Sequence, residues 1–241
     1  MNIKKLPALI LILLFLILFS GGISIQLLNP DLFQNTEWTP PIFILAAASI
    51  YLLGRTQKLI LILIIAGIIG FASEILGANT GFPYGEYKYT SKLGVQIFNV
   101  PLVLCCAWII VTSFSLDVLS FFKIKKIYFP FLFSSITTFY DFLIDPLMAG
   151  PLEYWVWSGN NNFYYNIPFQ NFIGWFLVSL FISILPWKEW KVKKTSILID
   201  FMLPSFFIFT ALVNQMYFAS IFGLVMLISL ACLLLIKKTT K

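Results

Sequence analysis

Residues 196–236 read SILIDFMLPSFFIFTALVNQMYFASIFGLVMLISLACLLLI, an apolar run of about forty residues with one charged residue, Asp200, near its start and a break in the middle at Asn214 and Gln215. A single helix of that length would reach about 60 Å at 1.5 Å per residue. The hydrocarbon core of a bilayer is only about 30 Å thick. We therefore predict two membrane-spanning helices, 196–213 and 216–236, joined by a turn at Asn214.

The rest of the chain repeats this pattern, with six more apolar runs ahead of the hairpin. The composition is 60% hydrophobic and 11% charged, whereas soluble domains carry about 25% charge. We predict an all-α, polytopic transmembrane bundle of about eight helices, in which residues 1–241 form a single integral membrane domain. We interpret the first run as a membrane helix that is not cleaved off, because it is longer than the apolar segment of a signal peptide. The six runs are 6–28, 40–54, 58–77, 100–121, 127–149 and 170–186.

The basic residues predict the orientation of the bundle. Cytoplasmic loops of membrane proteins are rich in Lys and Arg. If each predicted helix crosses the membrane once, fourteen of the sixteen basic residues lie on the same side. Only Lys88 and Lys92 fall on the other side. We therefore expect both termini in the cytoplasm of a multi-pass cell-membrane protein. The net charge of +6 is explained by these loops and does not indicate nucleic-acid binding. The fourteen are Lys4, Lys5, Arg55, Lys58, Lys123, Lys125, Lys126, Lys188, Lys191, Lys193, Lys194, Lys237, Lys238 and Lys241.

Three carboxyls stand out within the predicted helices. The chain has no histidine, so proton chemistry falls to carboxyls, tyrosines or lysines. Glu74 lies near the outer end of the third helix, and Asp141 and Asp145 share one face of the fifth because they are four residues apart. Ionisable groups in a membrane are functional candidates. We expect the aspartate pair to hold one proton, as an acid–base pair requires; the alternative is a pair bonded to backbone near Pro146.

Two other acids fall near the inner ends of helices. Asp117 and Asp200 are expected to reach water there and to have no chemical role. Asp31, Glu37 and Glu189 are read as loop residues.

Two long loops follow the helices that carry the three carboxyls. Residues 78–99 and 150–169 are rich in Gly, Pro, Asn and aromatic residues, and both fall on the outer side of the predicted topology. Tyr and Trp also settle at membrane interfaces without any site. Because acids and aromatic rings converge here, we predict a site at this face, where aromatic faces would stabilise a cation.

Cofactor motifs are absent from the sequence. It contains no P-loop, no GxGxxG after a strand, no HExxH, and no Asp-rich diphosphate motif. We expect no cofactor and no metal.

Several ordered motifs between about residues 70 and 180 resemble a known family. The sequence is similar to the carotenoid biosynthesis membrane proteins that contain the carotenoid 1′,2′-hydratases of the bisanhydrobacterioruberin hydratase type. The similar stretches are EILGANTGFPYGEYKY (74–89), LG (93–94), VP (100–101), YDFLIDPLM (140–148), YWVW (154–157), YNIP (165–168), NF (171–172) and GW (174–175).

The resemblance implies a cofactor-independent enzyme that hydrates the terminal C1=C2 double bond of an acyclic carotenoid in the bilayer. Protonation at C2 would leave a tertiary cation at C1, to which water adds. We expect Asp141 or Asp145 to donate the proton, and the other aspartate or Glu74 to orient the water and accept its proton. A downstream glycosyltransferase is a candidate partner. The residues expected to bind substrate are Tyr84, Tyr87, Tyr89, Tyr154, Trp155, Trp157 and Asn171.

Two other functions start from the same residues. A carotenoid cyclase also protonates a terminal alkene, but a ring closes where the hydratase adds water. Intramembrane acids also serve proton-coupled or lipid transporters, which often show internal repeats; we find no repeat in this sequence.

Overall fold

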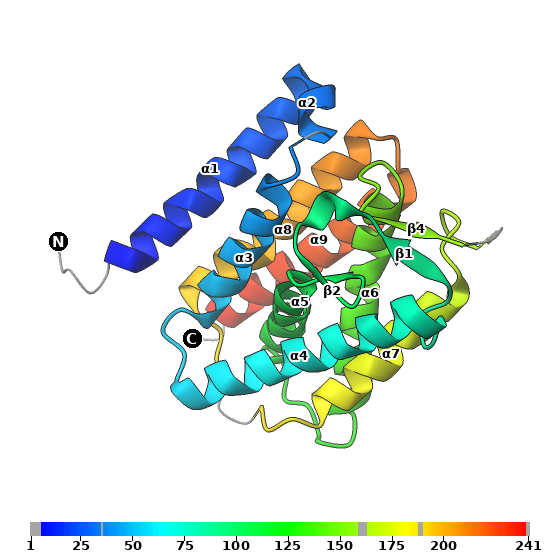
Figure 1. The fold of residues 1–241 in the computed structure, drawn as a ribbon. Coiled ribbons are helices and arrows are strands. Elements are labelled where there is room, and N and C mark those ends of the chain that lie inside the picture. The colour runs from blue at the N-terminus through cyan, green and yellow to red at the C-terminus, as the bar shows by residue number, and fades with distance from the viewer. Residues whose placement is uncertain (1–5, 35, 159–162, 188–189, 240–241) are drawn as a thin grey trace.

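The computed structural model describes residues 6–34, 36–158, 163–187 and 190–239. Lys4, Lys5, Lys188, Glu189 and Lys241 lie outside these ranges. Within them the chain forms eight long α-helices, the short α-helix α2 and one turn of 3-10 helix, η2 (Ser91–Leu93), so the predicted all-α bundle is confirmed (Figure 1). The helices are α1 (Leu6–Leu28), α2 (Pro30–Gln34), α3 (Thr39–Leu52), α4 (Gln57–Thr80), α5 (Leu104–Leu119), α6 (Phe129–Ala149), α7 (Phe169–Ser183), α8 (Lys194–Val213) and α9 (Tyr217–Thr239).

Four helices are long and apolar enough to cross a membrane: α1, α4, α8 and α9. The helices α3, α5 and α7 are apolar but have 14, 16 and 15 residues, which corresponds to about 21–24 Å at 1.5 Å per residue. The helix α6 has 21 residues, and its two aspartates lower its hydropathy. Length and composition thus support four of the predicted eight crossings.

The predicted hairpin of the last two helices is confirmed. The helix α8 ends at Val213 and α9 begins at Tyr217. Gln215 adopts a left-handed backbone conformation with φ of 59°, and the Met216 N–H donates to the Ala211 carbonyl at 2.8 Å. This tight turn returns α9 along α8.

Two glycines of α4 allow α5 to approach closely. A Cβ atom at Gly67 would lie 2.7 Å from the Cys105 carbonyl oxygen, and one at Gly70 would lie 2.0 Å from the Trp108 ring. Real Cβ atoms cannot occupy such positions, so the absence of side chains here sets the distance between the two helices. Trp108 is thereby placed against the face of α4 that carries Glu74.

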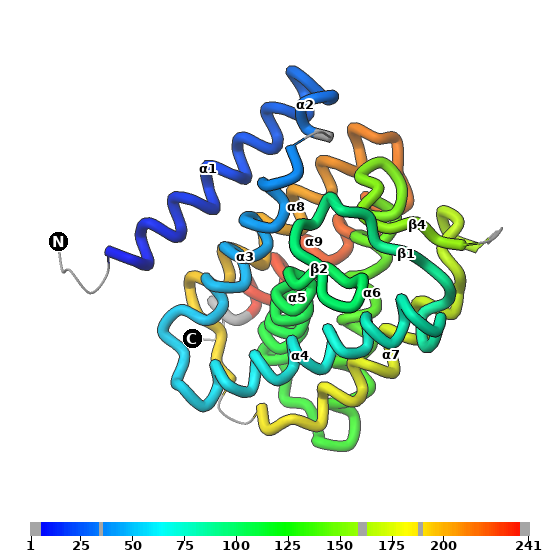
Figure 2. The backbone as a smooth tube through the Cα atoms, in the orientation of Figure 1, coloured from blue at the N-terminus to red at the C-terminus, as the bar shows by residue number. Residues whose placement is uncertain are grey.

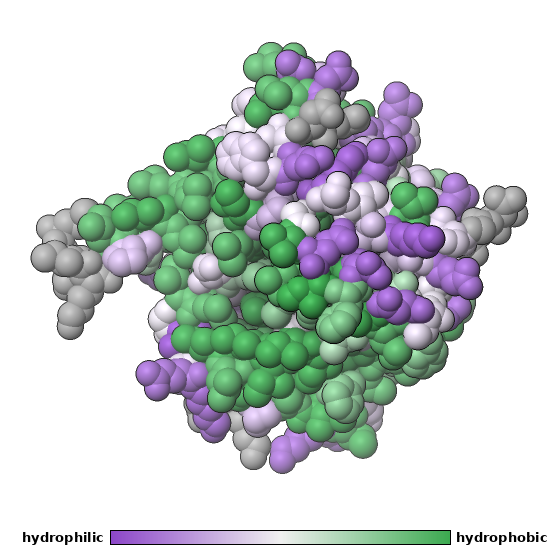
Figure 3. Space-filling model, in the orientation of Figure 1, coloured by the Kyte–Doolittle hydropathy of each residue, from purple (hydrophilic) through white to green (hydrophobic). Residues whose placement is uncertain are grey.

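The helix α1 lies along the outside of the bundle (Figure 2). Of its 23 residues only Phe15 and Gln26 are buried. In the view of Figure 3, hydrophobic residues cover α1 and α4, and hydrophilic residues gather toward the two ends of the bundle. This banded surface is what a protein with a lipid-facing middle requires.

The two long loops meet at one end of the bundle, as predicted. They contain two short strands, β1 (Tyr87–Tyr89) and β4 (Trp155–Trp157), which pair antiparallel. A second short pair, β2 (Gln96–Ile97) and β3 (Val100–Pro101), lies within the first loop. We call the end that carries these strands the sheet end.

Replacement of Gly70 by alanine is expected to destabilise the fold. The new methyl group would overlap the Trp108 ring, and overpacking of this kind costs about 1–3 kcal/mol. The measurement is the midpoint of thermal unfolding in detergent micelles. Gly21→Ala is the matched control, because a Cβ at Gly21 meets nothing within 4 Å. An unchanged midpoint for Gly70→Ala would contradict the close approach of α4 and α5.

Candidate functional site

Glu74 is held by three donors at the sheet end of α4. Its side chain is 6% exposed. One carboxylate oxygen accepts from the hydroxyls of Tyr87 at 2.6 Å and Tyr89 at 2.8 Å, and the other accepts from the Trp108 indole N–H at 3.2 Å. Burial, followed by the Glu74 charge, raises the pKa of both tyrosines. The tyrosines therefore stay protonated as donors, and surroundings that only donate suit an ionised carboxylate, which only accepts.

Asp141 and Asp145 form a second centre on α6, and each is 1% exposed. The side-chain amide of Asn171 on α7 donates to an Oδ2 atom of each, at 2.7 Å and 2.8 Å. Because both Oδ2 atoms accept from the same nitrogen, the distance between them cannot exceed the sum of these two hydrogen-bond lengths. The second oxygen of Asp145 accepts from the Trp155 indole at 2.7 Å. The second oxygen of Asp141 is buried and has no hydrogen-bond partner.

Pro146 follows this pair directly without ending the helix, which continues to Ala149. Proline has no backbone N–H, so the carbonyl four residues earlier, on Phe142, loses its helical partner. The Tyr164 hydroxyl donates to that carbonyl at 2.9 Å. The alternative is that backbone groups near Pro146 form hydrogen bonds with the aspartates. The structure shows side-chain donors, Asn171 and Trp155, in their place.

The β1–β4 ribbon covers both centres with aromatic rings. Alternate strand residues share a face, and the register pairs Tyr87 with Trp157 and Tyr89 with Trp155. Their ring centroids lie 4.9 Å and 5.7 Å apart. Since Tyr89 donates to Glu74 and Trp155 donates to Asp145, one face of the ribbon connects the two acidic centres. Val156, on the other face, is 55% exposed.

Tyr84 lies below the ribbon, between α4 and α7. Its hydroxyl forms a hydrogen bond with the Ser73 hydroxyl at 2.6 Å. A Cβ at Gly77 or at Gly174 would come within 2.6 Å of its ring, so both glycines make room for it. Tyr84 is edge-on to Tyr87 with centroids 6.2 Å apart, and it supports the ribbon from beneath.

Tyr154 is the one predicted site residue that lies elsewhere. It lines a cavity of about 460 Å³ bounded by α1, α3 and α8. The structure thus brings together Glu74, Asp141, Asp145, Tyr87, Tyr89, Trp155, Trp157 and Asn171, with Tyr84 beneath them.

Sequence reasoning missed Trp108, which donates to Glu74 and stacks on Trp175 with centroids 4.6 Å apart. The signal was the Gly67–Gly70 spacing on α4, which opens space for a large side chain on the neighbouring helix. Such spacing becomes informative only when the neighbour is known.

The expectation that Asp117 and Asp200 reach water is wrong, because they are 0% and 1% exposed. The Trp190 indole donates to Asp117 at 2.7 Å, and the Tyr51 hydroxyl donates to Asp200 at 2.5 Å. The Nη2 atom of Arg55 lies 3.9 Å from Oδ1 of Asp117, and its Cζ atom lies 3.7 Å from the centroid of the Trp190 ring. This cluster lies near the start of α4, about 25 Å from Glu74 along the helix axis.

No group of three His, Cys, Asp or Glu side chains within the described ranges is arranged to hold a metal ion. The hydrogen bonds of the carboxyls go to tyrosine, tryptophan and asparagine donors.

These features define a polytopic helical membrane protein with a buried carboxyl site beneath an aromatic ribbon. The family model described as carotenoid biosynthesis protein matches residues 38–237, so the chain belongs to that family. The match includes every predicted site residue and leaves out α1 and α2. No curated protein and no solved structure matches the chain.

Removal of the Tyr89 hydroxyl is expected to weaken the fold around Glu74. Tyr89→Phe leaves the buried carboxylate one donor short, which costs about 1–3 kcal/mol. Thermal unfolding of the purified protein in detergent measures the loss. Tyr128→Phe is the control, because Tyr128 is 58% exposed. Equal midpoints for the two variants would show that Tyr89 does not hold Glu74.

Proposed function

We propose that this protein is a carotenoid 1′,2′-hydratase, which adds water to the terminal C1=C2 double bond of an acyclic carotenoid. Membership of the carotenoid biosynthesis family supports the substrate class. The observation that carries the proposal is the buried Asp141 oxygen without a partner, beside a second carboxyl and an aromatic ribbon. An alkene has no hydrogen-bonding group, so an acid that protonates it needs an oxygen that no other group occupies.

The hydrogen bonds favour Asp141 as the acid. Its Oδ2 accepts from Asn171, and in this proposal the proton is carried by Oδ1, which has no hydrogen-bond partner. Both oxygens of Asp145 accept hydrogen bonds, which suits the ionised form. The two aspartates thus differ in role although they share one amide.

The reaction proceeds in two steps. The Asp141 O–H bond breaks, a C–H bond forms at C2 from the alkene electrons, and a tertiary cation remains at C1. Water adds at C1 and gives its proton to Asp145 or Glu74. Transfer of this proton back to Asp141 restores the acid, so the net change is the addition of one water. The faces of Tyr87, Trp155 and Trp157 and the negative charge of Glu74 stabilise the cation.

We also propose that the protein lies in the cell membrane with both termini in the cytoplasm. The tertiary alcohol that forms is a substrate for glycosyl transfer, so a carotenoid glycosyltransferase is the proposed next enzyme.

Product analysis tests the reaction. Expression in cells that make lycopene is expected to yield carotenoids heavier by one water for each modified end, as measured by mass spectrometry. A cyclic isomer of unchanged mass would show a cyclase, and unchanged lycopene would favour a carrier of protons or lipids. Either result would overturn the hydratase proposal.

Asp141→Asn and Asp145→Asn test the acid and its partner. Loss of general acid–base catalysis lowers the rate by about 10²–10⁴-fold, and we expect a loss of that size for each variant with normal membrane insertion. Glu37→Gln is the control, because it removes an exposed carboxyl. Wild-type turnover of both aspartate variants would show that neither aspartate takes part in the proton transfer.

A further inference from the structure

The cavity bounded by α1, α3 and α8 has a volume of about 460 Å³ and a mainly apolar lining. One wall is α1, along which it extends from Ile17 to Ile25, or about 12 Å at 1.5 Å per residue. The opposite wall includes Phe43 and Phe206, whose ring centroids lie 5.1 Å apart. A mainly apolar space of this size suits part of a hydrocarbon chain.

The lining of the cavity includes residues that lie near the carboxyl pair in the chain. Met148 lines it and lies seven residues after Asp141 and three after Asp145, so all three share one face of α6. Tyr154 also lines it and directly precedes Trp155, whose indole donates to Asp145. Met148, at the wall of the cavity, is therefore about one helical turn from Asp145 and about two turns from Asp141.

Two adjacent glycines shape the α1 wall. A Cβ at Gly22 would lie 2.8 Å from the Phe206 ring, whereas a Cβ at Gly21 would meet nothing within 4 Å. Gly22 thus lets α1 approach α8, and Gly21 borders open space in the cavity. A larger side chain at Gly21 would fill the cavity without striking the backbone.

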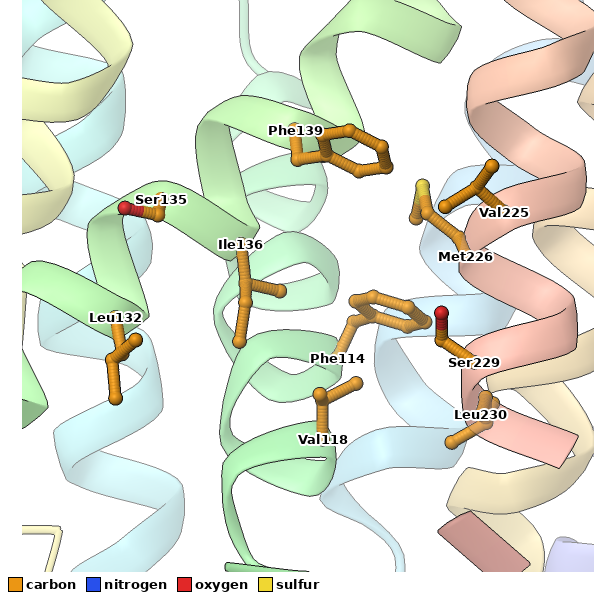
Figure 4. Close-up of a pocket in the computed structure, with 10 residues that line it drawn as sticks. All are labelled: Phe114, Val118, Leu132, Ser135, Ile136, Phe139, Val225, Met226, Ser229 and Leu230. Carbon is orange, nitrogen blue, oxygen red and sulfur yellow. The ribbon is translucent and has the colours of Figure 1, made fainter. Parts of the chain in front are cut away.

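A second apolar cavity, of about 280 Å³, lies between α5, α6 and α9. Figure 4 shows Phe139 of α6 pointing across it toward Met226 of α9. Phe139 lies two residues before Asp141, on the opposite face of α6 from the carboxyls. This cavity does not lead to them and provides a matched control.

We propose that the cavity beside α1 binds the polyene chain of the carotenoid next to its reacting end, with the rest of the chain in lipid. This proposal rests on the proposed function for the identity of the chain. A carotenoid is about as long as the hydrocarbon core is thick, about 30 Å, so the cavity holds less than half of it. The flat polyene packs against Phe43, Phe206 and Phe207, and its end group is directed past Met148 toward Asp141.

Cavity-filling variants test the proposal through binding and product formation. We expect Gly21→Phe to lower the amount of lycopene bound by the protein in phospholipid nanodiscs by about tenfold or more. Absorbance measures the bound lycopene. Hydrated product in lycopene-producing cells falls with it. Ile25→Trp fills the same cavity from one turn further along α1. It replaces Gly21→Phe as the test variant if Gly21→Phe does not fold. Gly21→Ala and Ser229→Phe, which fills the control cavity, leave both readouts at wild-type levels.

The outcomes separate this proposal from the hydratase reaction. Normal binding and hydration by folded Gly21→Phe or Ile25→Trp would overturn the cavity assignment and leave the hydratase function standing. Loss of lycopene binding in both variants, with no hydrated product from wild type, would support the cavity and overturn the reaction. Absence of lycopene binding by the wild-type protein would overturn the cavity assignment.

Discussion

Buried carboxyls need hydrogen-bond donors, and most of the site is built to supply them. In a membrane interior no water compensates a charged or polar group, so each unsatisfied group carries a large cost. Glu74 meets this need with Tyr87, Tyr89 and Trp108, and Asp145 meets it with Trp155 and Asn171. The donors come from α5, α7 and the ribbon, so the carboxyls fix how these elements join.

Asp141 departs from this rule, and the departure gives the site its chemical character. One of its oxygens has a partner and the other is buried without one. A fully satisfied network would be more stable, but it would hold every proton in a hydrogen bond. The open oxygen leaves Asp141 with a hydrogen-bonding capacity that no other group of the described chain uses.

The buried charges at the opposite end of α4 have a different set of partners, and one carboxylate oxygen each of Asp117 and Asp200 is buried there without a hydrogen-bond partner among the described residues. Arg55, near the start of α4, lies close to Asp117 and over Trp190, and Tyr51 donates to Asp200. The Arg55 side chain also donates to the Lys191 carbonyl, so the cluster ties the α3–α4 connection to the α7–α8 connection. A cation opposite the carboxyls distinguishes this end from the sheet end, where the donors of Glu74 and Asp145 are neutral.

The sequence by itself determined the helices, because apolar runs of membrane length leave the backbone no other way to satisfy its hydrogen bonds. It also brought Glu74, Asp141 and Asp145 to one end, since alternating helices carry both long loops there. Only the tertiary structure decided which donor serves which carboxyl. The contact from Trp108 depends on Gly70, and the burial of Asp117 and Asp200 depends on Arg55, Trp190 and Tyr51. Such contacts join residues far apart in the chain, and helix periodicity holds no information about which faces will meet.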